Sequence, residues 1–367
     1  MAQGLGNINH IMIEGYKSIR KARIDIKPIN ILIGANGSGK SNLLSFFNFL
    51  SALYEQRLQE YVALQGGEDK FLFCGKKITP ELSFHLEFAG SKNAYSVLLK
   101  VGENRFVFAS ENLIFDGNAW NIAEYGNESK LKDSEIYRAH YIRGLVTACQ
   151  KFHFHDTGSM SPFTKDWDIN KDGCSLYSDG GNIAAYLYHI RKGATPFYNT
   201  ILKTIQSVAP YFSDFYLEPN REGFLRLLWK DKRSALTWGV RDLSDGTLRF
   251  IALATLFLQP KLPSVIVIDE PELGLHPFAI AKLAGLIQSA AARGCQVITA
   301  TQSAGLINHF KPEDIVTVDL IEGATEFKRL DSEELTHWLD EYSLGELWER
   351  DILNSGRINF KEWEDLL

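Results

Sequence analysis

The chain has 367 residues, long enough for one large α/β domain or two smaller ones with a core of ordinary size. Hydrophobic residues make up 45% and charged residues 23%, which are values of a globular protein and exclude a chain that is mostly disordered. The formal net charge of −6 argues against a basic coat for nucleic acid over the whole surface, although a local basic patch stays compatible with it.

The cysteines and the apolar runs indicate the compartment. No CxxC pair and no Cys/His cluster at zinc spacing is present, so we expect buried free thiols in a reducing compartment. The N-terminal residues contain no apolar signal segment, and no apolar run approaches the roughly 18 residues that a membrane span needs. We therefore expect a cytoplasmic protein with no membrane partner. The four cysteines are Cys74, Cys149, Cys174 and Cys295.

The first half of the chain reads as strands, a helix and a meander. Residues 8–33 alternate as three strands, the last of which is the apolar run "INILIG". Residues 43–64 have helical periodicity, and a polar break follows at 65–70. Short strand-like runs separated by turn residues predict an antiparallel meander over 80–115. Residues 118–145 are polar, with a helix expected near their end.

The second half changes to a wound α/β pattern. A short strand is expected in 149–158, helices over 180–192 and 194–210, and strands in 214–219 and 224–230. From residue 243 a glycine turn, apolar helix, apolar strand, helix and strand follow one another, which is typical of a wound α/β sheet. The tail, 332–353, has the pattern of an amphipathic helix.

These elements predict an α/β nucleotide-binding head that is split in sequence, with an α+β lobe inserted between its two pieces. The first piece is 1–60 and the inserted antiparallel and helical lobe is 61–148. A helical and strand segment, 149–240, leads to the second piece of the head, 241–367.

The stretch from Gly34 to Ser41, "GANGSGKS", fits the phosphate-loop pattern GxxxxGK[ST] between an apolar strand and a helix. Its glycines let successive backbone N–H groups curl around phosphates at a positive helix end. Lys40 is expected to reach the β- and γ-phosphates, and Ser41 to place its hydroxyl on Mg²⁺. The predicted nucleotide-binding residues of this stretch are Gly34, Asn36, Gly37, Ser38, Gly39, Lys40, Ser41 and Asn42.

A second acidic element follows in "SVIVIDEPELGLHP". The apolar run Val265–Ile268 ends in Asp269 and Glu270, at the strand end where open α/β sheets bind ligands. Asp269 is expected to hold Mg²⁺ through water, and Glu270 to orient or deprotonate the attacking water. The alternative, an acidic pair that only caps a helix, is less favoured beside a convincing phosphate loop.

The stretch "LSDGTLRFIALA" opens an apolar helix with Ser244, Asp245 and Gly246. By itself it reads as an ordinary helix N-cap. A second anion-binding helix end in a chain that already has a phosphate loop needs a second nucleotide, most simply one held by a sister subunit.

The stretch resembles the signature motif of ABC-type ATPases, although Asp245 and Thr247 depart from the usual Gly and Gln/Glu. Together with "EGYKSIR", the phosphate loop, "VIDEPELGLHP" and "TATQS", the chain is similar to the RecF/SMC/OLD branch of AAA-family ATPases, and to its stand-alone members without coiled coil. This resemblance covers residues 8–60 and 145–350.

The resemblance implies ATP and Mg²⁺ held between two heads of a homodimer, with a higher oligomer possible. Ser244 and Gly246 of one head would close on the γ-phosphate bound by the other. The "EGYKSIR" segment implies weaker nucleotide contacts from Lys17 and Ser18. Tyr16 belongs to the same segment, but it reads equally well as an aromatic of the core.

Gln302 stands where the family usually has a switch histidine, which predicts slow ATP hydrolysis because an amide cannot carry charge. The family's glutamine loop is not evident; Gln150 lies near its expected place. Strand period places His153 and His155 on one face, but two histidines make half a zinc site, so a structural role is favoured. For His276, a structural or dimer-interface role is favoured over catalysis.

The resemblance implies an ATP-gated scaffold or sensor in anti-phage defence. We expect it to work with a separate TOPRIM-like nuclease, since no nuclease is evident in this sequence. The alternative is a DNA-binding clamp in repair or maintenance, like RecF and SMC proteins, which the net charge and the short basic clusters weaken. A transporter motor and a small-molecule kinase are disfavoured, the first by Gln302 and the second by the signature stretch.

Overall fold

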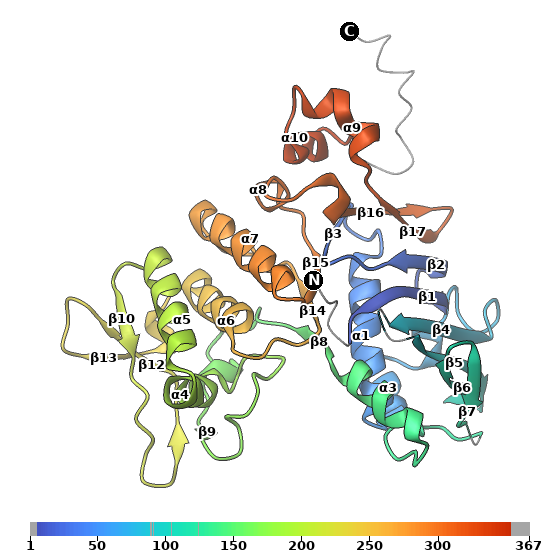
Figure 1. The fold of residues 1–367 in the computed structure, drawn as a ribbon, viewed down its shortest axis with the longest axis horizontal. Coiled ribbons are helices and arrows are strands. Elements are labelled where there is room, and N and C mark those ends of the chain that lie inside the picture. The colour runs from blue at the N-terminus through green and yellow to red at the C-terminus, as the bar shows by residue number, and fades with distance from the viewer. Residues whose placement is uncertain (1–5, 89, 91, 104, 124, 354–367) are drawn as a thin grey trace. The chain divides into compact units, whose positions relative to one another are not determined.

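The computed structural model describes residues 6–88, 90, 92–103, 105–123 and 125–353. They form two compact units (Figure 1). The first unit comprises Met1–Gln150, Pro263–Val267 and Gly294–Leu367, and the second comprises Lys151–Leu262 and Ile268–Arg293. The predicted division of the sequence at residues 60, 148 and 240 stays a prediction, and its last segment includes residues 354–367, which lie outside the described residues.

The first unit contains an antiparallel sheet with strand order β2-β1-β4-β5-β6-β7. Along β4 the apolar side chains alternate with polar ones, so that one face packs on the core and the other faces solvent. The sheet includes the predicted meander and two of the three predicted N-terminal strands. Its strands are β1 (Ile8–Tyr16), β2 (Ile19–Asp25), β4 (Glu81–Phe88), β5 (Asn93–Gly102), β6 (Arg105–Phe115) and β7 (Asn118–Asn121).

The second sheet is the α/β sheet, with strand order β17-β16-β3-β15-β14-β8. Central β3 is buried along its whole length and pairs in parallel with both β15 and β16, as expected for an apolar run covered on both faces. The boundary between the two units runs through β14 and β8. The strands are β3 (Ile29–Ile33), β8 (Cys149–Phe152), β14 (Val265–Asp269), β15 (Gln296–Ala300), β16 (Ile315–Ile321) and β17 (Ala324–Arg329).

Helix α1 (Lys40–Tyr54) supplies much of the core of the first unit. Phe46, Phe47 and Phe49 are all at most 1% exposed, and Phe46 makes an edge contact with Phe84 of the antiparallel sheet at a centroid distance of 5.2 Å. The chain continues into α2 (Leu58–Leu64) and, after the meander, α3 (Tyr137–Thr147), which packs on α1. The helix predicted over 43–64 is therefore two helices.

The break between α1 and α2 has a local cause. Gln56 has a φ of 56°, which a helix interior cannot adopt, and its side-chain amide donates to Ser129 O at 3.0 Å and to Asp133 at 2.7 Å. A tertiary contact thus interrupts a segment whose periodicity is helical throughout.

The second unit is mainly helical. Helix α6 (Asp245–Leu258) packs against α5 (Thr195–Val208) and α7 (Pro277–Ala292), and α4 (Ile183–Gly193) packs against α5. Nine of the fourteen residues of α6 are buried, from Leu248 to Phe257. Short strands complete the unit: β9 (Trp167–Asp168) with β11 (Phe224–Leu225), and β10 (Phe212–Phe215), β12 (Leu228–Asp231) and β13 (Thr237–Gly239) in one sheet.

The C-terminal part of the first unit carries the short helices α8 (Ala304–Ile307), α9 (Ser332–Leu339) and α10 (Leu344–Glu349). The predicted tail helix is wrong in one respect: it is divided, because Ser343 caps α10 by accepting from Glu346 N while Glu346 bonds back to Ser343. No helix among the described residues is long and apolar enough to cross a membrane. All four cysteines are free, but Cys74 and Cys174 are exposed, so only two of the expected buried thiols are buried.

One buried carboxylate joins the meander to the segment that leads to α3. Glu111 is completely buried, and Tyr95 OH and Ser129 Oγ both donate to its Oε1 at 2.6 Å. Lys130 N donates to Oε2 at 2.9 Å. A buried carboxylate is tolerated only when its oxygens accept hydrogen bonds in this way.

We predict that Tyr95→Phe lowers the free energy of unfolding by about 1.5–3 kcal/mol, the cost of losing a hydrogen bond to a buried charged group. Urea unfolding followed by circular dichroism measures the change. Tyr125→Phe, at a position 84% exposed, is the control and should change it by less than about 0.5 kcal/mol. Equal effects of the two changes would show that Tyr95 does not support Glu111.

Candidate functional site

The phosphate-loop stretch lies in the first unit, between the end of β3 at Ile33 and the start of α1 at Lys40. Gly37 and Gly39 have φ angles of 81° and 109°, which favour glycine. A Cβ at Gly39 would lie 2.0 Å from Thr325 Oγ1, and one at Gly34 would lie 2.1 Å from Val318 O. The loop therefore has its shape because three glycines are required there, two by conformation and two by close packing.

Lys40 is held inside this loop. The residue is 6% exposed, and its Nζ donates to Gly34 O at 2.6 Å and to Ala35 O at 2.9 Å. The ammonium group is thus directed by the loop's own carbonyls, at the helix end where an anion is favoured. Ser41 is exposed beside it. This arrangement fits the binding of a nucleotide phosphate.

A threonine that the sequence did not single out fixes the loop from behind. Thr325, at the start of β17, is 1% exposed, and its Oγ1 donates to Ser38 O at 2.9 Å. Thr325 Oγ1 also shares a hydrogen bond of 2.6 Å with Ser18 Oγ, which accepts from Asn42 Nδ2 at 2.6 Å. Ser18 and Asn42, both predicted as nucleotide contacts, are thereby brought to the loop. We refer to Ser18, Ser38, Asn42 and Thr325 as the loop lock.

Tyr16 and Lys17, the other two residues considered in "EGYKSIR", both form a hydrogen bond with Ser45 of α1. Tyr16 is fully buried, and burial raises the pKa of its hydroxyl, which is bonded to Ser45 Oγ at 2.9 Å. It is an aromatic of the core, the alternative that the sequence left open. Lys17 has a φ of 50°, and its Nζ donates to Ser45 Oγ at 2.8 Å and lies 5.3 Å from the centre of the Phe71 ring.

Gln302, which stands at the switch position in the sequence, contacts the loop. It follows β15, the neighbour of β3 in the sheet, and its Nε2 donates to Asn36 Oδ1 at 2.7 Å. Both side chains are exposed. The amide in the switch position thus contacts the tip of the phosphate loop directly.

The acidic pair, Asp269 and Glu270, lies in the second unit. Asp269 ends β14, and Glu270 follows it with a φ of 37°, a left-handed value that is unfavourable for a residue with a side chain. His155 Nε2 is hydrogen-bonded to Asp269 O at 3.0 Å. Burial lowers the pKa of Lys151, while the charge of nearby Asp269 opposes the shift. Backbone strain of this kind concentrates at functional sites.

The signature stretch forms the N-terminus of α6 in the same unit. Ser244 is exposed and caps the helix by accepting from Thr247 N at 3.3 Å. Gly246 packs so tightly that a Cβ would lie 2.2 Å from Gly274 O, so packing alone requires a glycine there. Arg249 donates to Leu273 O at 2.8 Å and to His155 O at 3.1 Å. Arg249 therefore joins the signature helix to the segments that follow β14 and β8.

The contacts of His153, His155 and His276, the histidines considered from the sequence, fit structural roles. His153 and His155 lie beyond the end of β8, not on it, with ring centroids 4.6 Å apart. Partial burial, His155 and Lys151 lower the pKa of His153. Among the described residues, neither histidine belongs to a group of three side chains that could hold a metal ion. His276 is the N-cap of α7, since its Nδ1 accepts from Phe278 N at 3.2 Å. Gln150 is exposed on β8, and its role stays open.

Two family models match separate parts of the chain. Residues 7–133 match the model described as "AAA ATPase domain", and residues 191–308 match "AAA domain, putative AbiEii toxin, Type IV TA system". A search of curated proteins found no match.

Solved structures share the fold. An Smc head bound to the C-terminal winged-helix domain of ScpA has a TM-score of 0.61 at 16% identity, over 90% of this chain and 99% of that one. An Smc head with an extended coiled coil, bound to the C-terminal domain of ScpA derived from Pyrococcus furiosus, has a TM-score of 0.59 at 16% identity, over 91% and 99%. The chain thus has the fold of an ABC-like P-loop ATPase head of the SMC type. The predicted fold class and the recognised resemblance to SMC- and RecF-like AAA ATPase heads are confirmed.

We predict that Thr325→Val weakens ATP binding by about 5- to 30-fold, because the isosteric change leaves Ser38 O and Ser18 without their partner at a cost of about 1–2 kcal/mol. Titration with a fluorescent ATP analogue measures the affinity. Thr336→Val on the exposed face of α9 is the matched control and should leave the affinity unchanged. Wild-type affinity in Thr325→Val would remove the loop lock from the site.

Proposed function

We propose that the chain binds ATP and Mg²⁺ between two copies of itself, hydrolyses ATP slowly, and uses closure and opening of this dimer to control a bound effector protein. The main observation behind the proposal is the phosphate loop. Its backbone carbonyls hold the ammonium group of the buried Lys40 inside the loop. The fold of an SMC-type head supports it, since a phosphate loop and a signature helix occur in one chain.

In this proposal the first unit supplies the phosphate cradle. Lys40 leaves the carbonyls of Gly34 and Ala35 for the β- and γ-phosphates, while the loop lock keeps the backbone N–H groups in place. Gln302 donates to Asn36 and is close enough to the loop tip to transfer its hydrogen bond to a γ-phosphate oxygen. An amide there senses the phosphate without adding charge, which is the reason to expect slow turnover.

The acidic pair supplies metal and water chemistry. When bound, Mg²⁺ neutralises charge on the phosphates; Ser41 and Asp269 are the residues proposed to hold it. The His155 hydrogen bond to Asp269 O restrains the backbone that carries this carboxylate. Glu270 is proposed to accept the proton of the attacking water, and its left-handed φ fixes the direction of its side chain.

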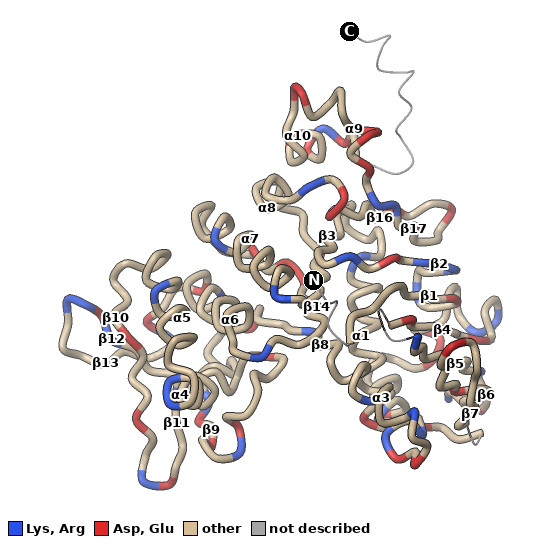
Figure 2. Tube along the Cα trace, viewed as in Figure 1, with Lys and Arg blue, Asp and Glu red and all other residues tan. Residues whose placement is uncertain are grey.

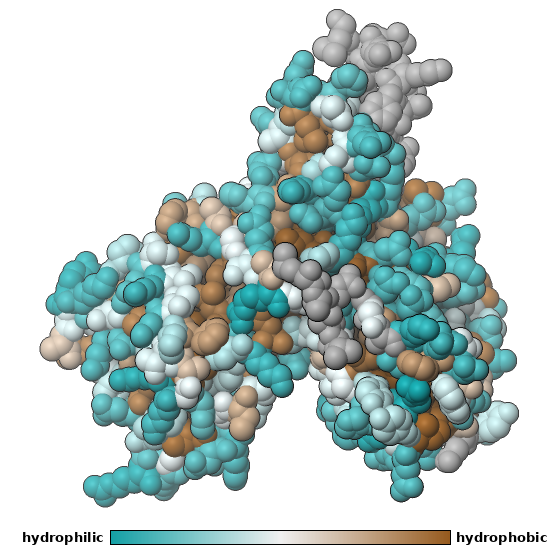
Figure 3. All heavy atoms as spheres, in the orientation of Figure 1, coloured by the Kyte–Doolittle hydropathy of each residue, from teal (hydrophilic) through white to brown (hydrophobic). Residues whose placement is uncertain are grey.

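The N-terminus of α6 is proposed to close on the γ-phosphate held by the partner copy. Ser244 is exposed at the positive end of a 14-residue helix, where an anion is stabilised. In the same unit, Leu273 and Phe278 are 46% and 49% exposed, and Arg249 of α6 donates to Leu273 O. Figure 3 shows hydrophobic side chains among hydrophilic ones over α7. Exposed apolar side chains of this kind are suited to a protein–protein contact.

The proposed kind of effector is based on the comparisons with known proteins. The Smc heads with this fold were solved with part of ScpA, a protein partner, and one matching family model carries a toxin–antitoxin description. These observations support a scaffold in defence with a separate effector, which we propose to be a TOPRIM-like nuclease.

The DNA-clamp alternative needs free basic clusters, and the two short ones in the sequence, residues 17–23 and 229–233, are partly neutralised. In the first, Lys21 pairs with Glu14 at 3.2 Å and Arg23 with Asp25 at 3.3 Å. In the second, Arg233 pairs with Asp231 at 3.2 Å. Figure 2 shows acidic residues close to the basic ones on β1 and β2. Such pairs leave less positive charge for DNA phosphates.

We predict that Glu270→Gln traps an ATP-bound dimer, because the substitution removes the base and keeps the other ATP contacts. Hydrolysis should fall by at least about 100-fold. Size-exclusion chromatography with light scattering, with ATP and Mg²⁺, measures the mass.

Glu322→Gln is the matched control, because Glu322 is an exposed glutamate that also has a positive φ, 49°. The double change Lys40→Ala/Glu270→Gln should stay monomeric with ATP. A monomeric Glu270→Gln protein at saturating ATP would contradict the sandwich.

We also predict that the ATP-trapped dimer binds DNA weakly and co-purifies with a TOPRIM-like effector protein when the two are co-expressed. Fluorescence anisotropy with duplex DNA at several salt concentrations measures the first. Tight binding that falls steeply as salt rises would favour the clamp instead.

A further inference from the structure

The solvent-facing side of the antiparallel sheet carries three side chains with metal-ligand chemistry. His10 lies on β1, and His85 and Glu87 lie on β4, two residues apart and therefore on the same face. The register pairs His10 with Glu87 and Met12 with His85. The ligand atoms of the three side chains all lie within 4.8 Å of one another. We refer to these three residues as the His–His–Glu cluster.

His10 is the buried member of the cluster and has an unused nitrogen. It is 5% exposed, and within the part of the chain that the structure describes its Nδ1 has no hydrogen-bond partner. The nearest acidic atom, Glu87 Oε2, is 3.7 Å away, beyond hydrogen-bond distance. Buried nitrogens of this kind normally have a partner, so the unpaired atom indicates that a partner belongs there. The ring of His85 stacks beside it, with centroids 5.9 Å apart.

The carboxylate of the cluster is already oriented. Asn9 Nδ2 donates to Glu87 Oε1 at 2.7 Å, which leaves Oε2 on the side of His10. A hydrogen bond to the second oxygen of a ligating carboxylate is the usual support of a metal ligand. Asp25, opposite His10 on β2, adds a second carboxylate on the other flank.

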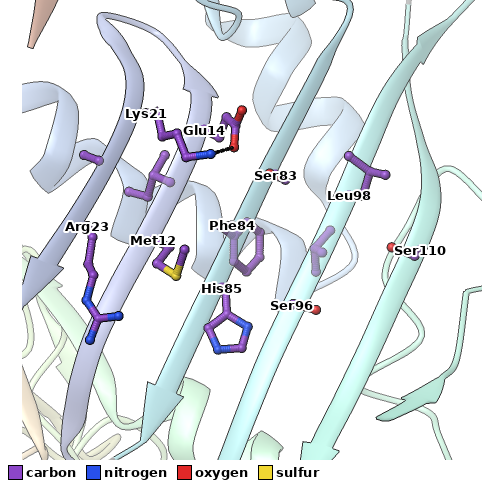
Figure 4. A pocket seen from close by; sticks show the side chains of 13 residues that line it. Met12, Glu14, Lys21, Arg23, Ser83, Phe84, His85, Ser96, Leu98 and Ser110 are labelled. Carbon is purple, nitrogen blue, oxygen red and sulfur yellow. Dashed lines mark ion pairs between the residues drawn. The ribbon is translucent and has the colours of Figure 1, made fainter. Parts of the chain in front are cut away.

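Solvent reaches the cluster from one side. His85 also lines a groove of about 370 Å³ on the same sheet face, together with Met12, Ser83 and Ser96. Figure 4 shows His85 projecting from β4 beside Met12 and Arg23. The Arg23 guanidinium pairs with Asp25 at 3.3 Å, which reduces its repulsion of a cation. An ion can therefore enter, and water can complete its coordination.

We propose that His10, His85 and Glu87 bind a divalent transition-metal ion, with zinc the best match to two imidazole nitrogens and one carboxylate oxygen. One water completes a tetrahedral site. Ligand atoms of such a site are roughly 3.3 Å apart, so side-chain rotations must bring the cluster together from its present spacing. The ion ties β1 to β4 and stabilises the sheet. This site is separate from the proposed ATP site, whose Mg²⁺ takes oxygen ligands only.

The test is calorimetric titration of tag-free, metal-stripped protein with zinc chloride, without nucleotide. We expect one equivalent of zinc with a dissociation constant of about 1 µM or tighter. His10→Ala, His85→Ala and Glu87→Gln should each weaken binding by at least about 10-fold, because one of three protein ligands is lost. His140→Ala removes an exposed histidine outside the cluster and should bind as wild type does. Zinc should also raise the thermal midpoint of wild type and not of the three variants.

Two further measurements keep the outcome decisive. Cobalt(II) should give the visible absorption of a tetrahedral site in wild type and in Lys40→Ala, and lose it in His85→Ala. Circular dichroism of the metal-free variants shows whether each is folded; if His10→Ala is not, Glu87→Gln alone decides. Wild type that fails to bind zinc at about 100 µM, or folded variants that bind it as well as wild type, would overturn the proposal.

Discussion

The buried charge of Lys40 is the constraint on which the rest of the site depends. An ammonium group removed from water is stable only when oxygen atoms surround it. Here two loop carbonyls meet it, and carbonyls carry only partial charge. The loop can present them because Gly34 and Gly39 accept close packing that any side chain would prevent. A nucleotide phosphate bound at this loop would add a full negative charge beside the ammonium group.

The same constraint explains why distant segments converge on the loop. Thr325 reaches it from β17, Ser18 from the turn after β1, and Gln302 from the end of β15. Each makes a hydrogen bond to the loop or to its lock, so the loop's shape is determined by the sheet as a whole. In the second unit, Arg249 fixes the signature helix by donating hydrogen bonds to Leu273 O and His155 O. Glu270, whose φ is left-handed, comes shortly before Leu273 in the sequence.

Local motifs were predictable from the sequence, and contacts between distant segments were not. The phosphate loop follows from glycine spacing between a strand and a helix, and the fold class follows from the order of elements. Thr325 gave no signal, because a threonine at the start of a strand is ordinary until the fold brings its Oγ1 to 2.9 Å from Ser38 O. The His–His–Glu cluster depends on the register of β1 and β4, which periodicity cannot supply. The break at Gln56 has the same cause, whereas the capping pair Ser343 and Glu346 was visible in the sequence and marks the divided tail.

Each ATP site is proposed to combine the loop of one copy with the signature helix of another, and a mixture of two inactive variants tests this pairing. Lys40→Ala disables the loop; Ser244→Asp keeps an N-cap but repels phosphate. Random pairing leaves one intact composite site in four, so the mixture should regain about a quarter of the wild-type ATPase rate. A mixture no more active than its components, although light scattering shows that the variants pair, would contradict the claim.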